Sequence, residues 1–171
     1  AAWARADREA ASLARAVESR THSVVKQFDR VRRVLESLGF LDGDRVTARG
    51  QQLRRVYGER DLVIAEALAS GAWEGLDAPG LAAIVSACVY ESRGDGASAL
   101  PAGLGPASRR AWEETSRVAA RVARAEAAAG VDASPPPDPA LMAACSAWAH
   151  GSTLATALAD SGIAGGDFVS A

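Results

Sequence analysis

The sequence predicts an all-α protein, a helical bundle with one small β-hairpin near residues 40–47. Alanine, the strongest helix former, accounts for roughly a quarter of the chain. Apolar residues recur at spacings of three and four along most of its length, which is the period of an amphipathic helix. That period breaks near residues 40–47, where the turn pair Asp42-Gly43 separates two short apolar pieces. With 49% hydrophobic and 23% charged residues in 171, the chain has the composition of a folded domain.

The first element is a long helix within residues 4–38. Its apolar face steps by four, three, four and three residues, through Val24, Phe28, Val31, Leu35 and Leu38. Gly39 is a natural end for this helix. After the hairpin, Thr47 can cap a second helix, which we expect to run to about Tyr57.

Two more helices follow in the middle of the chain. Asp61 is expected to cap a mostly apolar helix over residues 61–68. Asp77 and Pro79 are the N-cap and first-turn proline of the next helix, which extends to about Tyr90. That helix is apolar on nearly every side, so we expect it in the middle of the bundle.

The second half begins with a mobile loop at residues 93–107, rich in Gly, Ala, Ser and Pro. A helix from about Ser108 to Ala129 follows, and then a stiff proline-rich linker over residues 131–139. The remaining chain predicts a helix after Asp138-Pro139, a short helix over residues 153–160, and a helix capped by Asp167 that begins at about Phe168.

The residue inventory excludes several kinds of chemistry. The chain has a single lysine, Lys26, which does not follow a glycine-rich turn, so there is no P-loop to hold the phosphates of a nucleotide. Cys145 and His150 are five residues apart and do not share a helix face, so we predict no metal site.

Cys88 lies in an apolar run and is expected to be a buried, inert thiol; a catalytic pair with His150 is the alternative. No apolar run approaches the roughly 18 residues of a membrane span, so we expect no membrane partner.

Other polar and aromatic residues have both a functional and a structural interpretation. Asp61 and Glu66 resemble a pair of catalytic carboxylates, but helix capping and a structural role explain them better. The tryptophans at helical spacing could stack nucleic-acid bases, but we expect them to pack in the core (Trp73, Trp112 and Trp148). We predict no catalytic residue in this chain.

Several short strings, taken in order, resemble a known family. They are Val34-Leu35-Glu36-Ser37-Leu38-Gly39-Phe40-Leu41-Asp42, Val46-Thr47-Ala48-Arg49-Gly50, Asp61-Leu62-Val63-Ile64-Ala65-Glu66, Gly71-Ala72-Trp73-Glu74-Gly75-Leu76, Val89-Tyr90-Glu91, Trp148-Ala149-His150-Gly151 and Gly166-Asp167-Phe168-Val169. This order, from about residue 20 onward, resembles the C-terminal DSHCT domain of DExH-box RNA helicases of the exosome-associated type and their actinobacterial relatives.

The resemblance implies an accessory domain of an ATP-dependent RNA helicase in the cytoplasm. Such a domain packs on two motor domains of the same parent chain, which bind ATP and Mg²⁺, and it helps to form the path of single-stranded RNA. Residues 1–171 would be that domain, truncated at the start of its last long helix, which touches RNA bases in the family. Nucleic-acid contacts would then come from Glu91, Ser92, Arg93 and Ser170.

Each of these contacts has a plainer alternative. Glu91 could be a solvated carboxylate at a helix end, and Arg93 a loop arginine instead of a phosphate ligand. Family members often carry arginine at the position of Ser170, so this chain departs from the pattern there.

A second class of function is open. The helix and hairpin over residues 35–50 resemble part of a winged helix, and residues 153–169 have the rhythm of a helix-turn-helix. On that alternative the chain is a free-standing DNA-binding or protein-interaction module. A third and weaker alternative is an enzyme with Cys88 as nucleophile.

Overall fold

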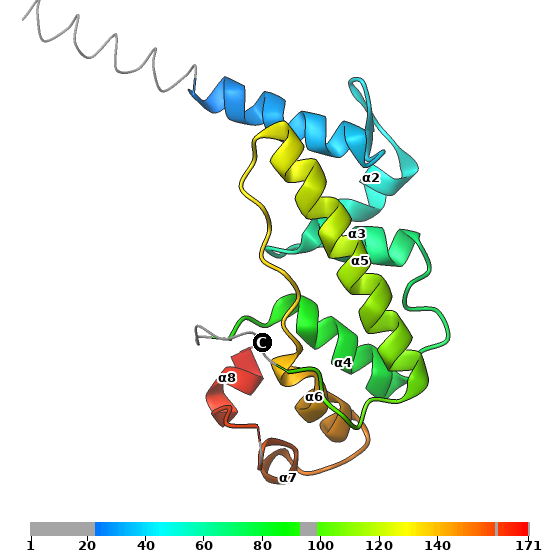
Figure 1. The fold of residues 1–171 in the computed structure, drawn as a ribbon, viewed down its shortest axis with the longest axis vertical. Helices are drawn as coiled ribbons and strands as arrows, with labels where there is room; N and C mark the ends of the chain where they lie inside the picture. Colours follow the sequence, from blue (N-terminus) through cyan, green and yellow to red (C-terminus); the bar gives the residue numbers. More distant parts are fainter. Residues whose placement is uncertain (1–22, 93–98, 160, 171) are drawn as a thin grey trace, which may run out of the picture.

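The computed structural model describes residues 23–92, 99–159 and 161–170. Within them the chain is mostly helical with one two-stranded antiparallel sheet, which confirms the predicted fold class (Figure 1). The elements are an N-terminal helix at residues 23–37, β1 (Leu41–Asp42), β2 (Arg45–Val46), α2 (Ala48–Leu53), α3 (Asp61–Ala69), α4 (Ala78–Val89), α5 (Pro106–Ala129), a 3₁₀ turn η1 (Pro139–Leu141), α6 (Met142–Ala149), α7 (Leu154–Leu158) and α8 (Gly165–Ser170). No helix among the described residues is long and apolar enough to cross a membrane.

The hairpin turn lies one residue later than the sequence suggested. Leu41 pairs with Val46 and Asp42 with Arg45, so Gly43 and Asp44 form the two-residue turn. Gly43 has φ of +57°, whereas Asp44 has an ordinary negative φ. Glycine at the first central position is the requirement of a type II′ turn, whose twist matches that of the two strands.

The capping role of Thr47 is confirmed. Its Oγ1 accepts a hydrogen bond from Gly50 N at 3.2 Å and donates one to Gly39 O at 2.8 Å, so one hydroxyl joins the start of α2 to the end of the N-terminal helix. Gly50 is required here because a Cβ would lie 2.3 Å from Phe40 O. The local string around Arg49 and Gly50 therefore encodes the tight contact of α2 with the chain that enters the hairpin.

Two helix boundaries differ from the sequence prediction. The helix α2 ends at Leu53 and not near Tyr57, because Arg55 N and Val56 N bond to carbonyls three residues back and tighten the last turn. The helix α5 begins at Pro106, two residues before Ser108, with proline in its first turn. The segment before it, residues 93–98, lies outside the described residues.

The helix α3 begins at Asp61, but Arg60 occupies the N-cap position without a side-chain cap. The carboxylate of Asp61 instead accepts a hydrogen bond from Leu62 N at 2.6 Å. Burial, with a smaller contribution from Glu126, raises the pKa of Asp61, while the bond from Leu62 lowers it. Asp61 is therefore a half-buried residue of the first turn and not the predicted cap.

The long helix α5 connects two hydrophobic clusters (Figure 1). What we call the Val63 cluster joins the N-terminal helix, α3 and the second half of α5 through Val34, Leu38, Phe40, Val63, Ala65, Val118, Val122 and Ala129. The Ile84 cluster joins the end of α3, α4, the start of α5 and α6 through Ala67, Trp73, Ala83, Ile84, Ala87, Cys88, Ala111 and Met142. The central position predicted for α4 is confirmed, since Ile84 is fully buried and α4 packs most extensively against α6.

The apolar face of the N-terminal helix is only partly covered. Leu38 is buried and Leu35 packs at the edge of the Val63 cluster. Toward residue 23 the same face is open, with Val24, Phe28 and Val31 exposed. The periodicity thus predicted the face correctly, but only the half of it near the hairpin meets other described residues.

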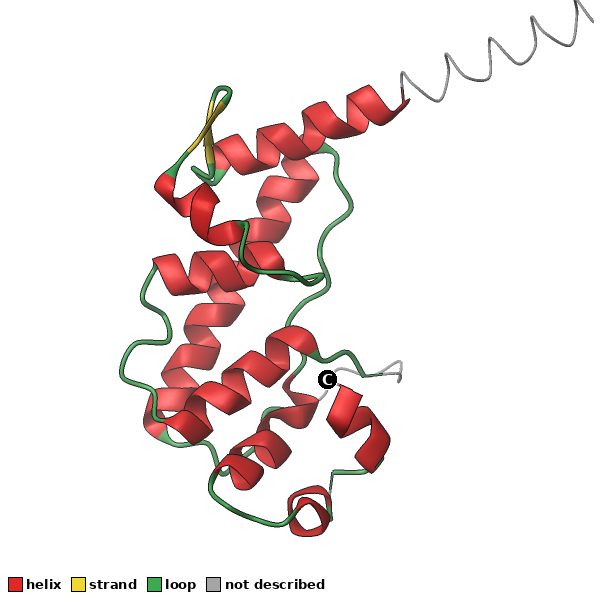
Figure 2. Cartoon of the chain, turned by 180° about the vertical axis from the view of Figure 1, so that it is seen from behind, coloured by secondary structure: helices red, strands yellow, loops and turns green. Residues whose placement is uncertain are grey.

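The proline-rich segment at residues 131–138 has no regular structure and runs back beside the bundle from the end of α5 to η1 (Figures 1 and 2). The buried carboxylate of Glu126 accepts hydrogen bonds from Ser134 N at 2.8 Å and Ser134 Oγ at 2.6 Å. This satisfies a charge that would otherwise be costly to bury, and it attaches the start of the segment to α5.

Candidate nucleic-acid interface

The predicted RNA-contacting segment follows α4 directly. Tyr90 is the C-cap residue of α4 in an extended conformation, and the chain leaves the helix there. Glu91 is exposed and Ser92 is half-buried. The structure therefore places the Glu91 carboxylate in solvent at a helix end, where it is free to meet a ligand or water.

The backbone of this segment is held by a buried arginine. The Arg60 side chain is 3% exposed, and its Nη1 donates to Cys88 O at 3.4 Å and Tyr90 O at 3.3 Å. Its Nε donates to the carbonyls of Pro135 at 3.0 Å and Pro136 at 3.1 Å. Arg60 thus ties the end of α4 to the proline-rich segment by charge-assisted hydrogen bonds, which are stronger than neutral ones.

Asp138 makes a second tie to the same segment. Its carboxylate accepts from Ser92 N at 2.8 Å, while its own backbone N donates to Ala87 O at 2.8 Å. The other carboxylate oxygen accepts from Ala140 N at 2.9 Å and caps η1, as the sequence predicted. The exposed Glu91 is therefore presented by a backbone that is fixed on both sides.

The second predicted contact lies at the end of the chain. The helix α8 begins at Gly165, because Phe168 N already bonds to Ala164 O, so Asp167 lies inside the helix and is not its N-cap. Ser170 is the last residue of α8, and its side chain, like all of Arg93, lies outside the described residues. Figures 1 and 2 both show α8 on the side of the bundle where α4 ends. The fold thus brings the two predicted contact regions to one side of the molecule.

The tryptophans do not share one role. Trp73 is buried, and its Nε1 donates to Thr115 Oγ1 at 2.9 Å, as expected for a core residue. Trp112 is half-buried against the same cluster. Trp148, predicted to pack in the core, is instead 56% exposed, because it lies at the end of α6 where the ring of Phe168 meets it edge-on at 6.1 Å. An exposed indole beside α8 is a surface on which a base can stack.

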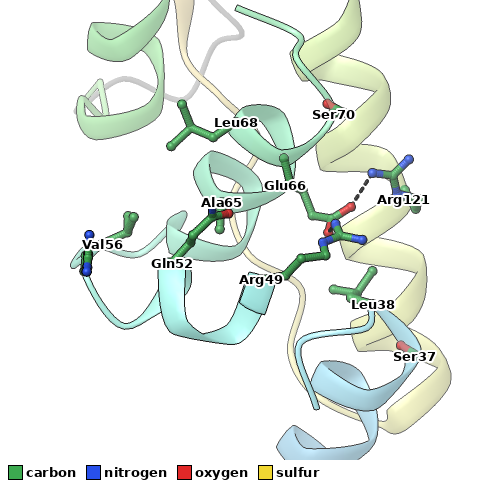
Figure 3. Close-up of a pocket in the computed structure, with 12 residues that line it drawn as sticks. Ser37, Leu38, Arg49, Gln52, Val56, Ala65, Glu66, Leu68, Ser70 and Arg121 are labelled. Atoms are coloured by element: carbon green, nitrogen blue, oxygen red, sulfur yellow. Dashed lines mark hydrogen bonds and ion pairs between the residues drawn. The ribbon is translucent and has the colours of Figure 1, made fainter. Parts of the chain in front are cut away.

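Glu66 is a structural residue, as predicted. Its side chain is 3% exposed, and its two oxygens accept from Arg49 on α2 and Arg121 on α5 (Figure 3). Both arginines are roughly half exposed. The carboxylate therefore joins three helices and is not available as a general acid or base.

The candidate cysteine chemistry is not supported. Burial raises the pKa of the Cys88 thiol to about 11, against a lowering by the nearby Arg60 charge, so the thiolate needed for nucleophilic attack is scarce at neutral pH. His150 is exposed at the C-cap of α6, and its Nδ1 lies 2.9 Å from Ser146 O. Burial also raises the pKa of Cys145. Among the residues that the structure describes, no three His, Cys, Asp or Glu side chains gather as metal ligands.

Sequence reasoning missed Arg60 and Glu126, the two residues that organise the proline-rich segment. Arg60 stands just before a helix and Glu126 near the end of one, where charged side chains are usually solvated, and their partners are 75 and 8 residues away in sequence. One signal was available for Glu126. It follows Val118 and Val122 at intervals of four, so the helical period places this charge on the buried side of α5.

Comparison with known proteins agrees with this architecture. Residues 43–171 match the model of the DSHCT (NUC185) domain. The chain is 37% identical over 181 aligned positions to the "Probable helicase HelY" of Mycobacterium tuberculosis H37Rv, and 36% identical to that of Mycobacterium leprae. Each match covers 98% of this chain and 20% of the relative, so the chain spans about a fifth of the length of these proteins. The chain belongs to the DSHCT domain family.

Proposed function

We propose that this chain is an accessory domain of an ATP-dependent RNA helicase, which packs on the motor domains of its parent protein and helps to form the path of single-stranded RNA. The observation that carries the proposal is the match to the probable helicases, which takes in 98% of this chain but 20% of theirs. A domain that corresponds to a fifth of such a protein contributes one part of that protein's function.

Two features of the surface support the RNA contact. Glu91 is exposed on a backbone fixed by Arg60 and Asp138, and α8 lies on the same side with the exposed ring of Trp148 beside it. A fixed carboxylate can accept from the amino groups of bases, and an indole face can stack on them. These residues, with Ser92, Arg93 and Ser170, are the proposed nucleic-acid contacts.

The residues of this chain do not form a phosphate-binding loop for ATP with its Mg²⁺. The only lysine, Lys26, lies between Val25 and Gln27 on the N-terminal helix, and no glycine-rich phosphate loop precedes a helix here. ATP binding and hydrolysis, with Mg²⁺, are therefore assigned to the motor domains of the parent chain. RNA processing in the cytoplasm is the setting that the proposal implies.

The test compares the parent protein with a version from which residues 1–171 are deleted. The deleted version should retain ATP hydrolysis by its motor domains but unwind a tailed RNA duplex at least tenfold more slowly, because the RNA path is incomplete. Full unwinding by the deleted version would refute the proposal. Tight duplex DNA binding by residues 1–171 alone would favour the winged-helix alternative.

A further inference from the structure

A groove lined by arginines lies on the half of the molecule away from α8. Its larger part is a cavity of about 870 Å³ between α2, α3, α5 and the end of the N-terminal helix (Figure 3). A second cavity of about 450 Å³ shares Ser37, Leu38 and Arg121 with the first, so the two adjoin, and we call them together the arginine groove. Figures 1 and 2 both show these elements at the opposite end of α5 from α6 and α8.

The groove is strongly positive although the whole chain is not. Five arginines line its two parts against a single carboxylate, Glu66, while the chain as a whole has a net charge of −2 (Arg33, Arg49, Arg55, Arg121 and Arg124). Glu66 neutralises only part of the charge on its two arginines. A concave surface of one sign concentrates ions of the opposite sign, so the groove selects for anions.

Several N–H donors of these arginines have no acceptor in the part of the chain that the structure describes. The guanidinium groups of Arg55 and Arg124 make no hydrogen bond or ion pair with the described residues, and Arg49 Nε is buried without a hydrogen-bond partner. A buried donor without an acceptor is unfavourable. Arg55 and Arg124 are exposed, so an anionic ligand at the mouth of the groove can accept from their free donors. The guanidinium fork matches the oxygens of a phosphate in a bidentate way.

The shape of the groove indicates the class of anion. The arginines follow one another from Arg55 through Arg121 to Arg124 across two adjoining cavities, so a single small anion would meet only some of them. The lining also includes apolar side chains, among them Leu38, Val56 and Leu68. A single-stranded nucleic acid offers both a repeating charge and the apolar surface of unpaired bases and sugars, whereas a peptide of acidic residues offers mainly the charge.

We infer that the arginine groove binds the backbone phosphates of single-stranded RNA, as a second contact region separate from Glu91 and α8. The inference rests on the proposed function and adds a second RNA-binding region to it. In this arrangement RNA held at the α8 side has a second anchor at the other end of α5. Removing the groove contacts should then weaken RNA binding without changing the α8 side.

The test is a fluorescence anisotropy titration of the chain with a labelled 20-nucleotide oligouridylate at low salt. The double variant Arg55→Glu and Arg124→Glu should bind at least tenfold more weakly, and its log–log salt slope should be shallower by about 1.4 for two lost phosphate contacts on a single strand. The matched control is Arg45→Glu with Arg110→Glu, two exposed arginines outside the groove, which should lose less than threefold. Equal losses in both double variants would overturn the inference, because the affinity would then come from diffuse charge.

Melting temperatures identify any variant that fails to fold, and Arg55→Gln with Arg124→Gln then replaces the charge reversal, with an expected loss of at least threefold. Photocrosslinking with 4-thiouridine in the same oligonucleotide locates the contacts. Crosslinks in residues 49–56 or 121–124 support the groove. Crosslinks only in residues 88–92 or α8 would overturn the groove and leave the proposed function intact, whereas no crosslink and no binding would count against both. Tighter binding of polyglutamate than of oligouridylate, lost in the groove variant, would assign the groove to an acidic protein segment and overturn the RNA inference.

Discussion

The two clusters that α5 connects are stabilised in different ways. The Ile84 cluster is built from small and apolar side chains, and its buried hydroxyls bond locally: Ser86 to Ala83 O at 2.7 Å and Thr115 to Ala111 O at 2.7 Å. The Val63 cluster lies beside two buried carboxylates, Glu66 and Glu126. Close packing thus fixes one end of the bundle, whereas buried carboxylates bonded to two half-exposed arginines and to Ser134 help to fix the other.

The largest effect is expected in the Ile84 cluster. Ile84→Asp would place an unpaired carboxylate in a fully buried site, so we expect a loss of about 4 kcal/mol or more in the free energy of unfolding. Urea denaturation followed by circular dichroism measures it. Val85→Asp, at the half-buried neighbouring position, is the control and should cost clearly less. A loss for Ile84→Asp as small as that for an exposed position would contradict the central position of α4.

An intermediate effect is expected beside the Val63 cluster. Glu66→Gln leaves Arg49 and Arg121 without their counter-charge, and we expect a loss of about 2 kcal/mol, below the cost of breaking a fully buried pair because both arginines reach solvent. The loss should shrink as salt screens the two arginines. Glu114→Gln, which removes an exposed pair with Arg117, is the control and should change stability by less than about 0.5 kcal/mol. If the two variants proved equally mild, the ion pairs would not contribute to this half of the fold.

The smallest effect is a dependence on alkaline pH that belongs to the Ile84 cluster. The pKa of Cys88 is about 11 in the folded chain against 9.0 for an ordinary thiol. The unfolded chain therefore ionises this thiol first, and the contribution of the neutral Cys88 to the free energy of unfolding, complete below pH 9, is lost as the pH rises toward 11. By pH 10 the loss should be about 1 kcal/mol. Melting temperatures at pH 8 and pH 10 measure it, and Cys88→Ala should fall less between them than the unaltered chain. An identical fall in both proteins would contradict the assigned origin.

Sequence reasoning was most successful where the chain's own local chemistry decides the structure. Thr47 and Asp77 were identified as caps because a short oxygen-bearing side chain must satisfy the free N–H groups of the helix that follows. Helix α4 was identified as central because no face of it is polar. The expected structural role of Glu66 was also correct, although its two arginine partners were not foreseen.

The predictions that failed depended on what surrounds a residue. Trp148 has the spacing of a core residue but lies at a helix end with one ring beside it, so it remains exposed. Val24 and Phe28 have the spacing of a buried face, yet both side chains remain exposed. Periodicity reports which side of a helix is apolar, and it contains no information about whether a second element covers that side.

The sequence by itself determined the helices, the hairpin, the main caps and the family, because these depend on local propensity, on period and on the order of short strings. Only the tertiary structure decided the contacts made by charges. Arg60 reaches carbonyls as far as 76 residues away, Glu66 joins arginines 17 and 55 residues away, and five arginines from three helical segments gather in one groove. Such partners are unrelated in sequence because a hydrogen bond or ion pair requires proximity in space, and the packing of the helices and of the proline-rich segment creates that proximity.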